Sequence, residues 1–271
     1  FAAMGDLDVW YSRLDATEML DVLKREHNAQ VARDVEHIIQ RARRNDGRRA
    51  LSTLTTADAA GLHFVHDPPL LVPVSEMAPD VASSVESSVA EITRSYRASL
   101  AADRRVLLDR FTRVDIARKV VGIGSVGTEC WVVLLVGRDA DDPLFLQVKE
   151  AKTGRRVVEG QRLMQAASDI FLGWSRDFYV RQLRDWKVSL NVEAVGLEGF
   201  AYYVRACGWT LARAHARAGD RIAIAAYLGG SDRFDRAVGE FASAYADLNA
   251  RDHRALQQAV TDGRVRAAEG V

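Results

Sequence analysis

Apolar residues recur every three or four positions over much of the first and last thirds of the chain. Such spacing places apolar side chains along one side of an α-helix. It predicts helices over residues 31–42, 81–111 (one helix or two in series), 200–214 and 234–248. The segment Asn45-Asp46-Gly47 is expected to end the first of these helices.

Residues 48–75 show a different pattern, because turn-forming residues replace the regular apolar repeat. The segment Asp67-Pro68-Pro69 predicts a turn, and the apolar residues 70–74 after it predict an extended piece that leaves the turn. We therefore expect a turn-rich segment here.

From about residue 113 the pattern becomes that of β-strands, with β-branched residues and short turns. It predicts three strands, a helix and two more strands, in the order 114–121, 130–136, 144–149, 156–170, 171–174 and 178–183. The turns between the first three strands are too short for a crossover, so these strands should pair antiparallel. The predicted fold class is α+β: an antiparallel five-stranded sheet with helices before and after it. The expected division is a mainly helical region at 1–111, a sheet region with one helix at 112–190, and a helical region at 191–271.

Composition narrows the classes of function. Hydrophobic residues make up 48% of the 271 positions, enough for a sizeable core, and 37 basic residues balance 37 acidic ones. This balance argues against binding to nucleic acid or to a membrane surface, either of which favours a basic excess. No apolar run approaches the roughly 20 residues of a membrane helix, and Cys130 and Cys207 lie in apolar runs, which predicts buried thiols in a reducing compartment. We therefore expect a cytoplasmic protein, and since the chain begins with Phe1, one cut from a longer protein.

The spacing Gly122-x-Gly124-x-x-Gly127 is the first candidate for chemistry. In dinucleotide-binding folds such glycines lead into a helix, whereas in kinases they join two antiparallel strands and lie over the phosphates of ATP. The strand-like residues 130–136 that follow favour the kinase-like interpretation. Ser125 would then belong to the loop over the phosphates. A plain hairpin turn is the alternative.

The kinase-like interpretation requires a lysine on the third strand, an acid on the next helix and a linker beside the adenine. Lys149 on the strand 144–149, with Phe145 and Gln147 on the same side, meets the first requirement. Glu159 is the candidate acid that orients the lysine, with Glu150 a poorer one. The linker would be Gln182, Leu183 and Arg184, at the end of the last strand. A solvated lysine and a surface glutamate are the plainer alternatives.

Several segments together resemble a bacterial family of unknown function, DUF2252. The segments are LDVWY at 7–11, VVGIGSVGT at 120–128, LFLQVKEA at 144–151, RVVEGQRLMQ at 156–165, DFYVRQLR at 177–184 and LARAHAR at 211–217. The resemblance covers essentially the whole chain. The stretch between residues 151 and 156 looks shorter here than in relatives, which could shift Glu159 relative to Lys149.

The resemblance implies a kinase-like or aminoglycoside-phosphotransferase-like fold with a permuted chain order. Longer members carry an N-terminal Gly-Asp-x-His-x-x-Asn type segment and an Asp-rich strand, which resemble a catalytic loop and a Mg²⁺ site. This chain would then be the C-terminal, ATP-binding part of a phosphotransferase with an unknown acceptor. Its Mg²⁺ ligands would lie outside the chain, so that the chain alone would be inactive. The alternatives are a non-catalytic regulatory or scaffold protein with this fold, and an unrelated binding module.

Other candidate residues have simpler interpretations, so no catalytic or metal-binding residue is assigned. His215 is expected to pack on a helix face, and the spacing of His63 and His66 suits no metal site without further ligands. Asp232 and Asp235 resemble a magnesium motif, but they more simply cap the next helix. The arginines within residues 41–44 are expected at a solvated helix end.

Overall fold

The structure, a computed structural model, describes residues 1–15, 21, 33, 35–37, 39–40, 47–59, 61–120, 127–165, 167–183 and 195–267. The chain divides into two compact units. One consists of Phe1 and Ala3–Ala218, and the other of Ala2 and Gly219–Val271. The predicted strands all belong to the first unit.

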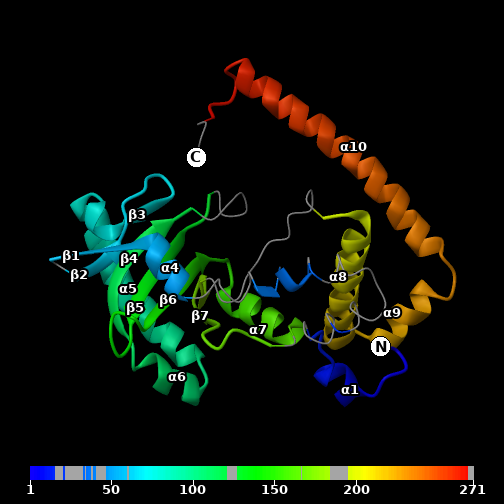
Figure 1. Ribbon diagram of the computed structural model, residues 1–271, viewed down its shortest axis with the longest axis horizontal. Coiled ribbons are helices and arrows are strands. Elements are labelled where there is room, and N and C mark those ends of the chain that lie inside the picture. The colour runs from blue at the N-terminus through cyan, green and yellow to red at the C-terminus, as the bar shows by residue number, and fades with distance from the viewer. Residues whose placement is uncertain are drawn as a thin grey trace. The chain divides into compact units, whose positions relative to one another are not determined.

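The first unit is built around an antiparallel sheet of six strands (Figure 1). In spatial order these are β3 (Leu71–Pro73), β4 (Thr112–Lys119), β5 (Cys130–Val136), β6 (Pro143–Glu150), β8 (Phe178–Gln182) and β7 (Gly173–Ser175). The predicted α+β class and antiparallel pairing are confirmed, but the predicted count of five strands in this sheet is wrong. The additional strand, β3, is only three residues long and exists through its pairing with β4. The sequence indicated an extended piece there, but a local pattern cannot show a distant partner.

Both faces of the sheet bury apolar side chains, which is why β5 and β6 are nearly continuous apolar runs. The two faces have separate cores. One contains Tyr96, Leu100, Leu108, Leu135, Leu144, Leu146, Val148, Phe171 and Val180. The other contains Ala50, Leu54, Phe64, Leu71, Ala117, Val132, Leu134 and Phe145.

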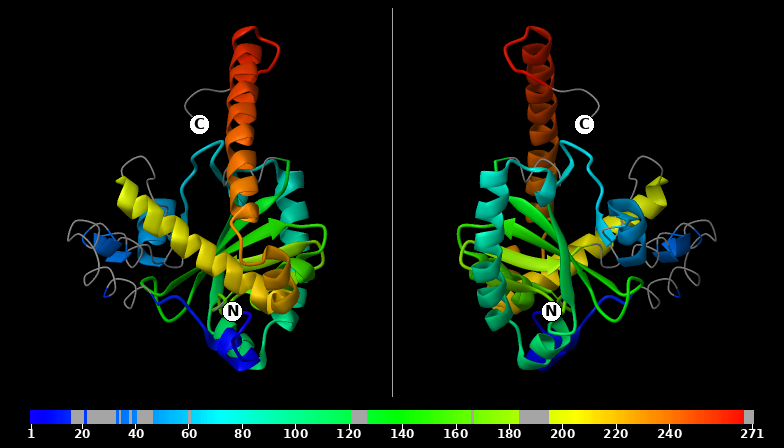
Figure 2. Two further views of the ribbon diagram at one scale, coloured as in Figure 1. Left: turned by 90° about the vertical axis from the view of Figure 1, so that its right-hand side faces the viewer. Right: turned by 90° about the vertical axis from the view of Figure 1, so that its left-hand side faces the viewer.

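Helices and short elements cover the two faces. The first core is covered by α5 (Pro79–Ser99), which runs alongside the sheet (Figure 2), and by α6 (Ala102–Leu108). The 3-10 turn η1 (Val74–Glu76) joins β3 to α5. On the other face lie α4 (Gly47–Leu54) and α7 (Gly154–Met164).

The segment predicted to be turn-rich is more regular than expected. It contains helix α4 and a hairpin of β1 (Thr55–Asp58) and β2 (Gly61–Phe64). Gly47 begins a helix, where the sequence predicted a helix end; Asn45 and Asp46 lie outside the described residues. Ala50 and Leu54, one turn apart, are buried against the sheet. Two apolar positions are too few to show a helical period, so this helix depends on tertiary packing that the local sequence does not indicate.

Helices α1 (Asp6–Tyr11) and α8 (Leu197–Ala218) complete the first unit. The buried guanidinium of Arg213 on α8 donates hydrogen bonds to the carbonyl oxygens of Trp10 at 3.0 Å, Met164 at 3.4 Å and Ser12. The guanidinium of Arg217, one turn later, lies 3.8 Å from the centre of the Trp10 ring. These arginines therefore tie the first helix and the end of α7 to α8.

The second unit contains α9 (Arg221–Leu228) and α10 (Arg233–Thr261). Asp220 caps α9, because its carboxylate accepts hydrogen bonds from the backbone N–H groups of Ile222 and Ala223, each at 3.0 Å. Asp232 occupies the position before α10, as predicted, but its carboxylate makes no capping hydrogen bond and instead pairs with Arg236 at 3.3 Å. Across the described part of the chain, none of the helices has an apolar stretch long enough to cross a lipid bilayer.

Candidate functional site

Lys149 lies half-buried near the end of β6, and the predicted strand alternation around it is confirmed. We call the face of the six-stranded sheet that carries Lys149, Gln147 and Phe145 the lysine face. Lys149 pairs with Cys130 on one side and with Tyr179 on the other. Among the described residues, no carboxylate lies within ion-pair distance of the Lys149 amine.

Two further cations share the lysine face. Arg181 pairs with Gln147 in the ladder, and its Nε donates a hydrogen bond to the Gln147 Oε1 at 3.2 Å. Lys119 lies two residues after Ala117, which belongs to the buried core of this face, so it projects to the same side. Within the paired rows that contain Lys149 and Gln147, none of the described positions is acidic. These two rows therefore carry positive charge, while the neighbouring row of Phe145 contains Asp115, whose carboxylate accepts a hydrogen bond from the Phe64 backbone N–H.

The pKa of the Cys130 thiol is affected by this charge. Burial raises the pKa of Cys130, while three nearby cations act against this shift. The cations are Lys149, Lys119 and Arg181. All three side chains therefore lie close enough to a single buried atom to affect its ionisation.

The glycine-rich segment lies between β4 and β5 in the sequence. Gly122, Gly124 and Ser125 lie outside the described residues, whereas Gly127 is described and has a φ of +78°, a left-handed conformation that glycine adopts without strain. The pairing of Cys130 with Lys149 places the lysine directly opposite the third residue after Gly127. The backbone N–H of Glu150 also donates to the Glu129 carbonyl oxygen at 2.9 Å, which extends the ladder toward the loop.

Glu159 lies on α7, the predicted helix, but its carboxylate pairs with Arg155 at 2.7 Å and not with Lys149. Helix α7 packs on the lysine face: its Arg155 and Arg162 guanidiniums lie 5.9 and 5.7 Å from the centre of the Trp174 ring. Trp174 pairs with Tyr179 and so shares the face of Lys149. The helix predicted to carry the acid is therefore on the expected side of the sheet, while the predicted ion pair is not formed.

The start of the helix comes unusually close to β8. A Cβ atom added to Gly154 would lie 1.9 Å from the Phe178 carbonyl oxygen. Only glycine allows this approach, which fixes where α7 begins relative to the lysine face.

The predicted adenine linker is only partly described. The backbone N–H of Leu183 donates to the Phe145 carbonyl oxygen at 2.8 Å, and that of Gln182 donates to the Asp169 carboxylate. The side chain of Leu183 packs against the core around Phe145. Both backbone donors are therefore used inside the protein, and Arg184 lies outside the described residues.

The remaining candidates are distributed over the molecule. His63 and His66 are partly exposed and lie 3.8 and 4.0 Å from Asp58 and Glu76. Cys207 is exposed on α8, so the prediction of a second buried thiol is wrong, because the apolar stripe of α8 lies largely at the surface. No group of three or more His, Cys, Asp or Glu that could hold a metal ion occurs in the described ranges. Residues 41–44 lie outside them.

Sequence reasoning missed Arg181 and Lys119 as members of the lysine face. A signal was present, since Tyr179 and Arg181 alternate along a predicted strand. The register that brings them beside Lys149 is a long-range property, however, and only the structure gives it.

A comparison with protein families matches residues 1–154 and 151–259 to DUF2252, described as an uncharacterized protein conserved in bacteria. The chain belongs to this family. The two matched parts meet at residues 151–154 of the DUF2252 chain, between β6 and α7, where the sequence indicated a shortened connection. No curated protein and no solved structure matches the chain.

Proposed function

We propose that the lysine face binds the phosphate groups of ATP, as the nucleotide-binding part of a kinase-like phosphotransferase. The observation that supports this most directly is the pairing of Cys130 with Lys149. It places a half-buried amine beside the end of a glycine-rich hairpin, with Arg181 and Lys119 on the same face. Anionic phosphate oxygens are natural partners for such a group of cations.

The order of elements also supports the proposal. Along the chain, β4, the glycine-rich segment, β5, β6 with its lysine, and α7 follow in the order that kinases use. In this arrangement Lys149 holds the phosphates, and Gly127 lets the backbone approach them without an intervening side chain. Arg181 supplies a second positive charge. Glu159 can orient Lys149 only if its carboxylate leaves Arg155 and pairs with the Lys149 amine.

ATP-dependent chemistry normally requires Mg²⁺ bound by carboxylates. The proposal assigns no Mg²⁺ ligand to the described residues. The ligands would come from the segment that longer family members carry before this region. The described residues therefore account for binding and orienting the phosphates, and for no proton or phosphoryl transfer.

The test is calorimetric titration of the 271-residue chain with Mg-ATP, in the wild type and in Lys149→Ala. Loss of the amine should weaken binding by roughly tenfold or more, since a charge-assisted bond to phosphate contributes about 1.5–3 kcal/mol. Lys152→Ala is the matched control, because Lys152 is exposed in the turn just after β6 and should leave binding unchanged. Equal affinity in Lys149→Ala and wild type, with both variants folded, would remove Lys149 from the site.

One observation favours a non-catalytic alternative. The Glu159 carboxylate is held by Arg155, so the Lys–Glu pair that active kinases require is not formed. A regulatory or scaffold protein would bind Mg-ATP and release it unchanged. Measuring ADP release under saturating Mg-ATP separates the two when the full-length protein with its N-terminal segment is used: slow hydrolysis supports the enzyme, and binding without hydrolysis supports the alternative.

A further inference from the structure

A cavity of about 930 Å³ lies on the face of the sheet opposite Lys149, between α5 and the strands. We call it the α5 cavity. Its floor is formed by β-strand residues that include Ile116, Trp131 and Val133, and its roof by residues of α5 that include Val85 and Val89. Its position separates it from the proposed phosphate site, so neither site requires the other.

The cavity exists because α5 is held close to the sheet at one end only. Near the C-terminal end of α5, the Tyr96 hydroxyl donates to the Phe171 carbonyl oxygen at 2.8 Å, and Ser99 Oγ accepts from Trp174 N at 2.9 Å. A Cβ atom on Gly173 would lie 2.7 Å from the Tyr96 ring, so helix and strand touch directly there. Toward the other end, the apolar side chains of α5 are only partly buried. They face the sheet without filling the space between.

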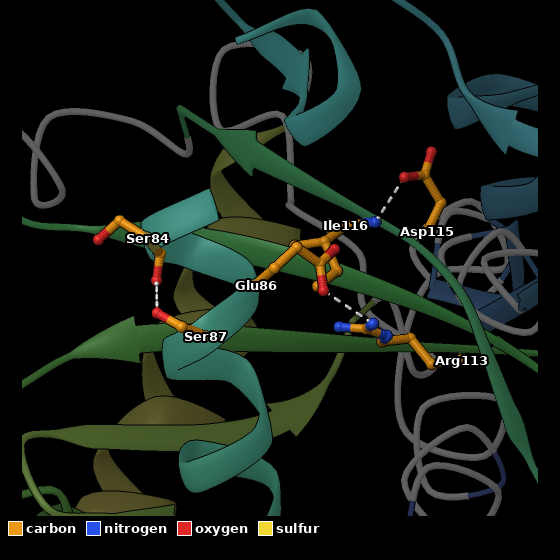
Figure 3. A network of polar contacts seen from close by, with 6 residues as sticks. All are labelled: Ser84, Glu86, Ser87, Arg113, Asp115 and Ile116. Atoms are coloured by element: carbon orange, nitrogen blue, oxygen red, sulfur yellow. Dashed lines mark hydrogen bonds and ion pairs between the residues drawn. The ribbon is translucent and has the colours of Figure 1, made fainter. Parts of the chain in front are cut away.

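Two ion pairs span the sides of the cavity. Glu86 on α5 pairs with Arg113 on β4 at 2.9 Å (Figure 3), and Glu91 on α5 pairs with Arg176 after β7 at 2.9 Å. Arg97 and Asp109, which also line the cavity, pair with each other. Six of the charged residues that line the cavity are therefore paired with each other. Arg94, Glu129 and Asp177 also line it, so the lining has one more acidic than basic residue.

One of the hydroxyl groups on the helical wall, that of Ser88, is occupied within the protein. The Ser88 hydroxyl donates to the Ser84 carbonyl oxygen at 3.0 Å, and the hydroxyl of Ser87, outside the cavity, donates to the same oxygen at 2.8 Å (Figure 3 draws the Ser87 bond). At the closed end, burial raises the pKa of the Tyr96 hydroxyl, which is consistent with a dry interior. A ligand would therefore find mainly hydrocarbon surface.

From the size, the mainly apolar walls and the largely paired rim, we infer that the α5 cavity binds a neutral, mainly hydrocarbon small molecule. The volume falls at the upper end of the range of roughly 300–1,000 Å³ that small-molecule sites occupy. Apolar cavities of proteins bind apolar molecules because these gain contacts that water cannot replace. A molecule with a full charge is disfavoured, because moving an ion from water against mainly apolar walls costs free energy.

The test is a fluorescence titration of the 271-residue chain with N-phenyl-1-naphthylamine, an uncharged probe that brightens in apolar surroundings. We expect saturable one-to-one binding, with energy transfer from Trp131 in the cavity floor. Val89→Phe and Val133→Phe place larger side chains in the cavity and should weaken binding about tenfold. Val81→Phe is the matched control on α5, because Val81 is exposed outside the cavity and should leave binding unchanged.

Competition experiments then define the ligand class. 1-Decanol should displace the probe at lower concentrations than decanoate or decylammonium; stronger displacement by either ion would overturn the assignment of a neutral ligand. Thermal unfolding of each variant shows whether it is folded. Trp131→Phe should keep binding and reduce energy transfer more than Trp174→Phe does, which tests the location without filling the cavity. Absent saturation, or equal weakening by Val89→Phe and Val81→Phe, would overturn the site itself. Binding that falls as the protein dimerises would show that a second copy of the chain occupies the cavity.

Discussion

The two faces of the six-stranded sheet use the same strands in different ways. On the lysine face, Phe145 and Val132 are buried, and the polar residues Lys149, Gln147 and Arg181 occupy adjacent rows of the ladder. On the opposite face, α5 is tightly packed at one end and leaves the α5 cavity at the other. Because successive side chains of a strand alternate between the two faces of the sheet, one strand can place polar groups on one side and line an apolar cavity on the other.

The largest effect on the free energy of unfolding is expected at Gly154, where the start of α7 contacts the backbone of β8 directly. Gly154→Ala would force a Cβ atom to within 1.9 Å of the Phe178 carbonyl oxygen, so α7 must shift. We expect a loss of roughly 3 kcal/mol or more in the free energy of unfolding, measured by chemical denaturation. Gly160→Ala in the same helix is the control: nothing lies within 4 Å of its added Cβ, and it should stabilise the protein by about 0.5–1 kcal/mol. Similar losses in both variants would contradict a contact specific to Gly154.

A second prediction compares two adjacent valines on β5 that face opposite sides. Val132 is completely buried on the lysine face, whereas Val133 lines the α5 cavity. Val132→Ala should cost about 2–3 kcal/mol of unfolding free energy, and Val133→Ala about 1 kcal/mol or less, because its side chain has fewer contacts to lose. Denaturation of the two variants under identical conditions tests this. Equal costs would mean that the cavity is filled by protein in solution.

A third prediction sharpens the functional difference between the faces. Arg181→Met removes a cation from the lysine face and should weaken binding of Mg-ATP about tenfold, more so at low salt. Arg113→Met removes an arginine from the rim of the α5 cavity and should leave ATP affinity unchanged. Calorimetry at two ionic strengths distinguishes them; an equal effect of both substitutions would show a nonspecific charge effect.

The smallest predicted effect is on how the free energy of unfolding depends on pH. The hydrogen bond from Arg97 lowers the pKa of the exposed Asp109 carboxyl beside the α5 cavity. Because this carboxyl has a lower pKa in the folded state than in the unfolded state, it stabilises the fold at pH values above the unfolded pKa of about 3.9. This stabilisation is lost as the pH falls through the pKa of the folded state. The difference in unfolding free energy between wild type and Asp109→Asn should therefore be small, and should shrink further below about pH 4. Measurements at pH 6 and pH 3 check this; a difference that grows toward pH 3 would contradict the sign.

Much of the sheet could be predicted from the sequence, because its strands carry strong local signals. The run CWVVLLV at 130–136 is β5 itself, and the predicted strand 144–149 differs from β6 by one residue at each end. Lys149 was assigned to its face by simple alternation. The family assignment also came from local motifs, and the family comparison confirms it.

What the sequence could not give depends on long-range packing and on competition between partners. Arg155, one turn before Glu159, takes the carboxylate that was assigned to Lys149. The apolar stripe of α8 predicted burial for Cys207, but no element covers that part of the stripe within the described residues. The α5 cavity is set by how far a helix stands from a sheet, which no local pattern encodes.

The outermost strands of the sheet, β3 and β7, have three residues each, while the interior strands β4, β5 and β6 have seven or eight. The long apolar strands β5 and β6 therefore lie in the interior of the sheet, whereas β3 covers the outer edge of β4 only at Ala117, Arg118 and Lys119. Short borders of this kind are a common protection against intermolecular β-aggregation. A chain with such an apolar centre can thus remain dispersed without any basic or acidic excess to keep its copies apart.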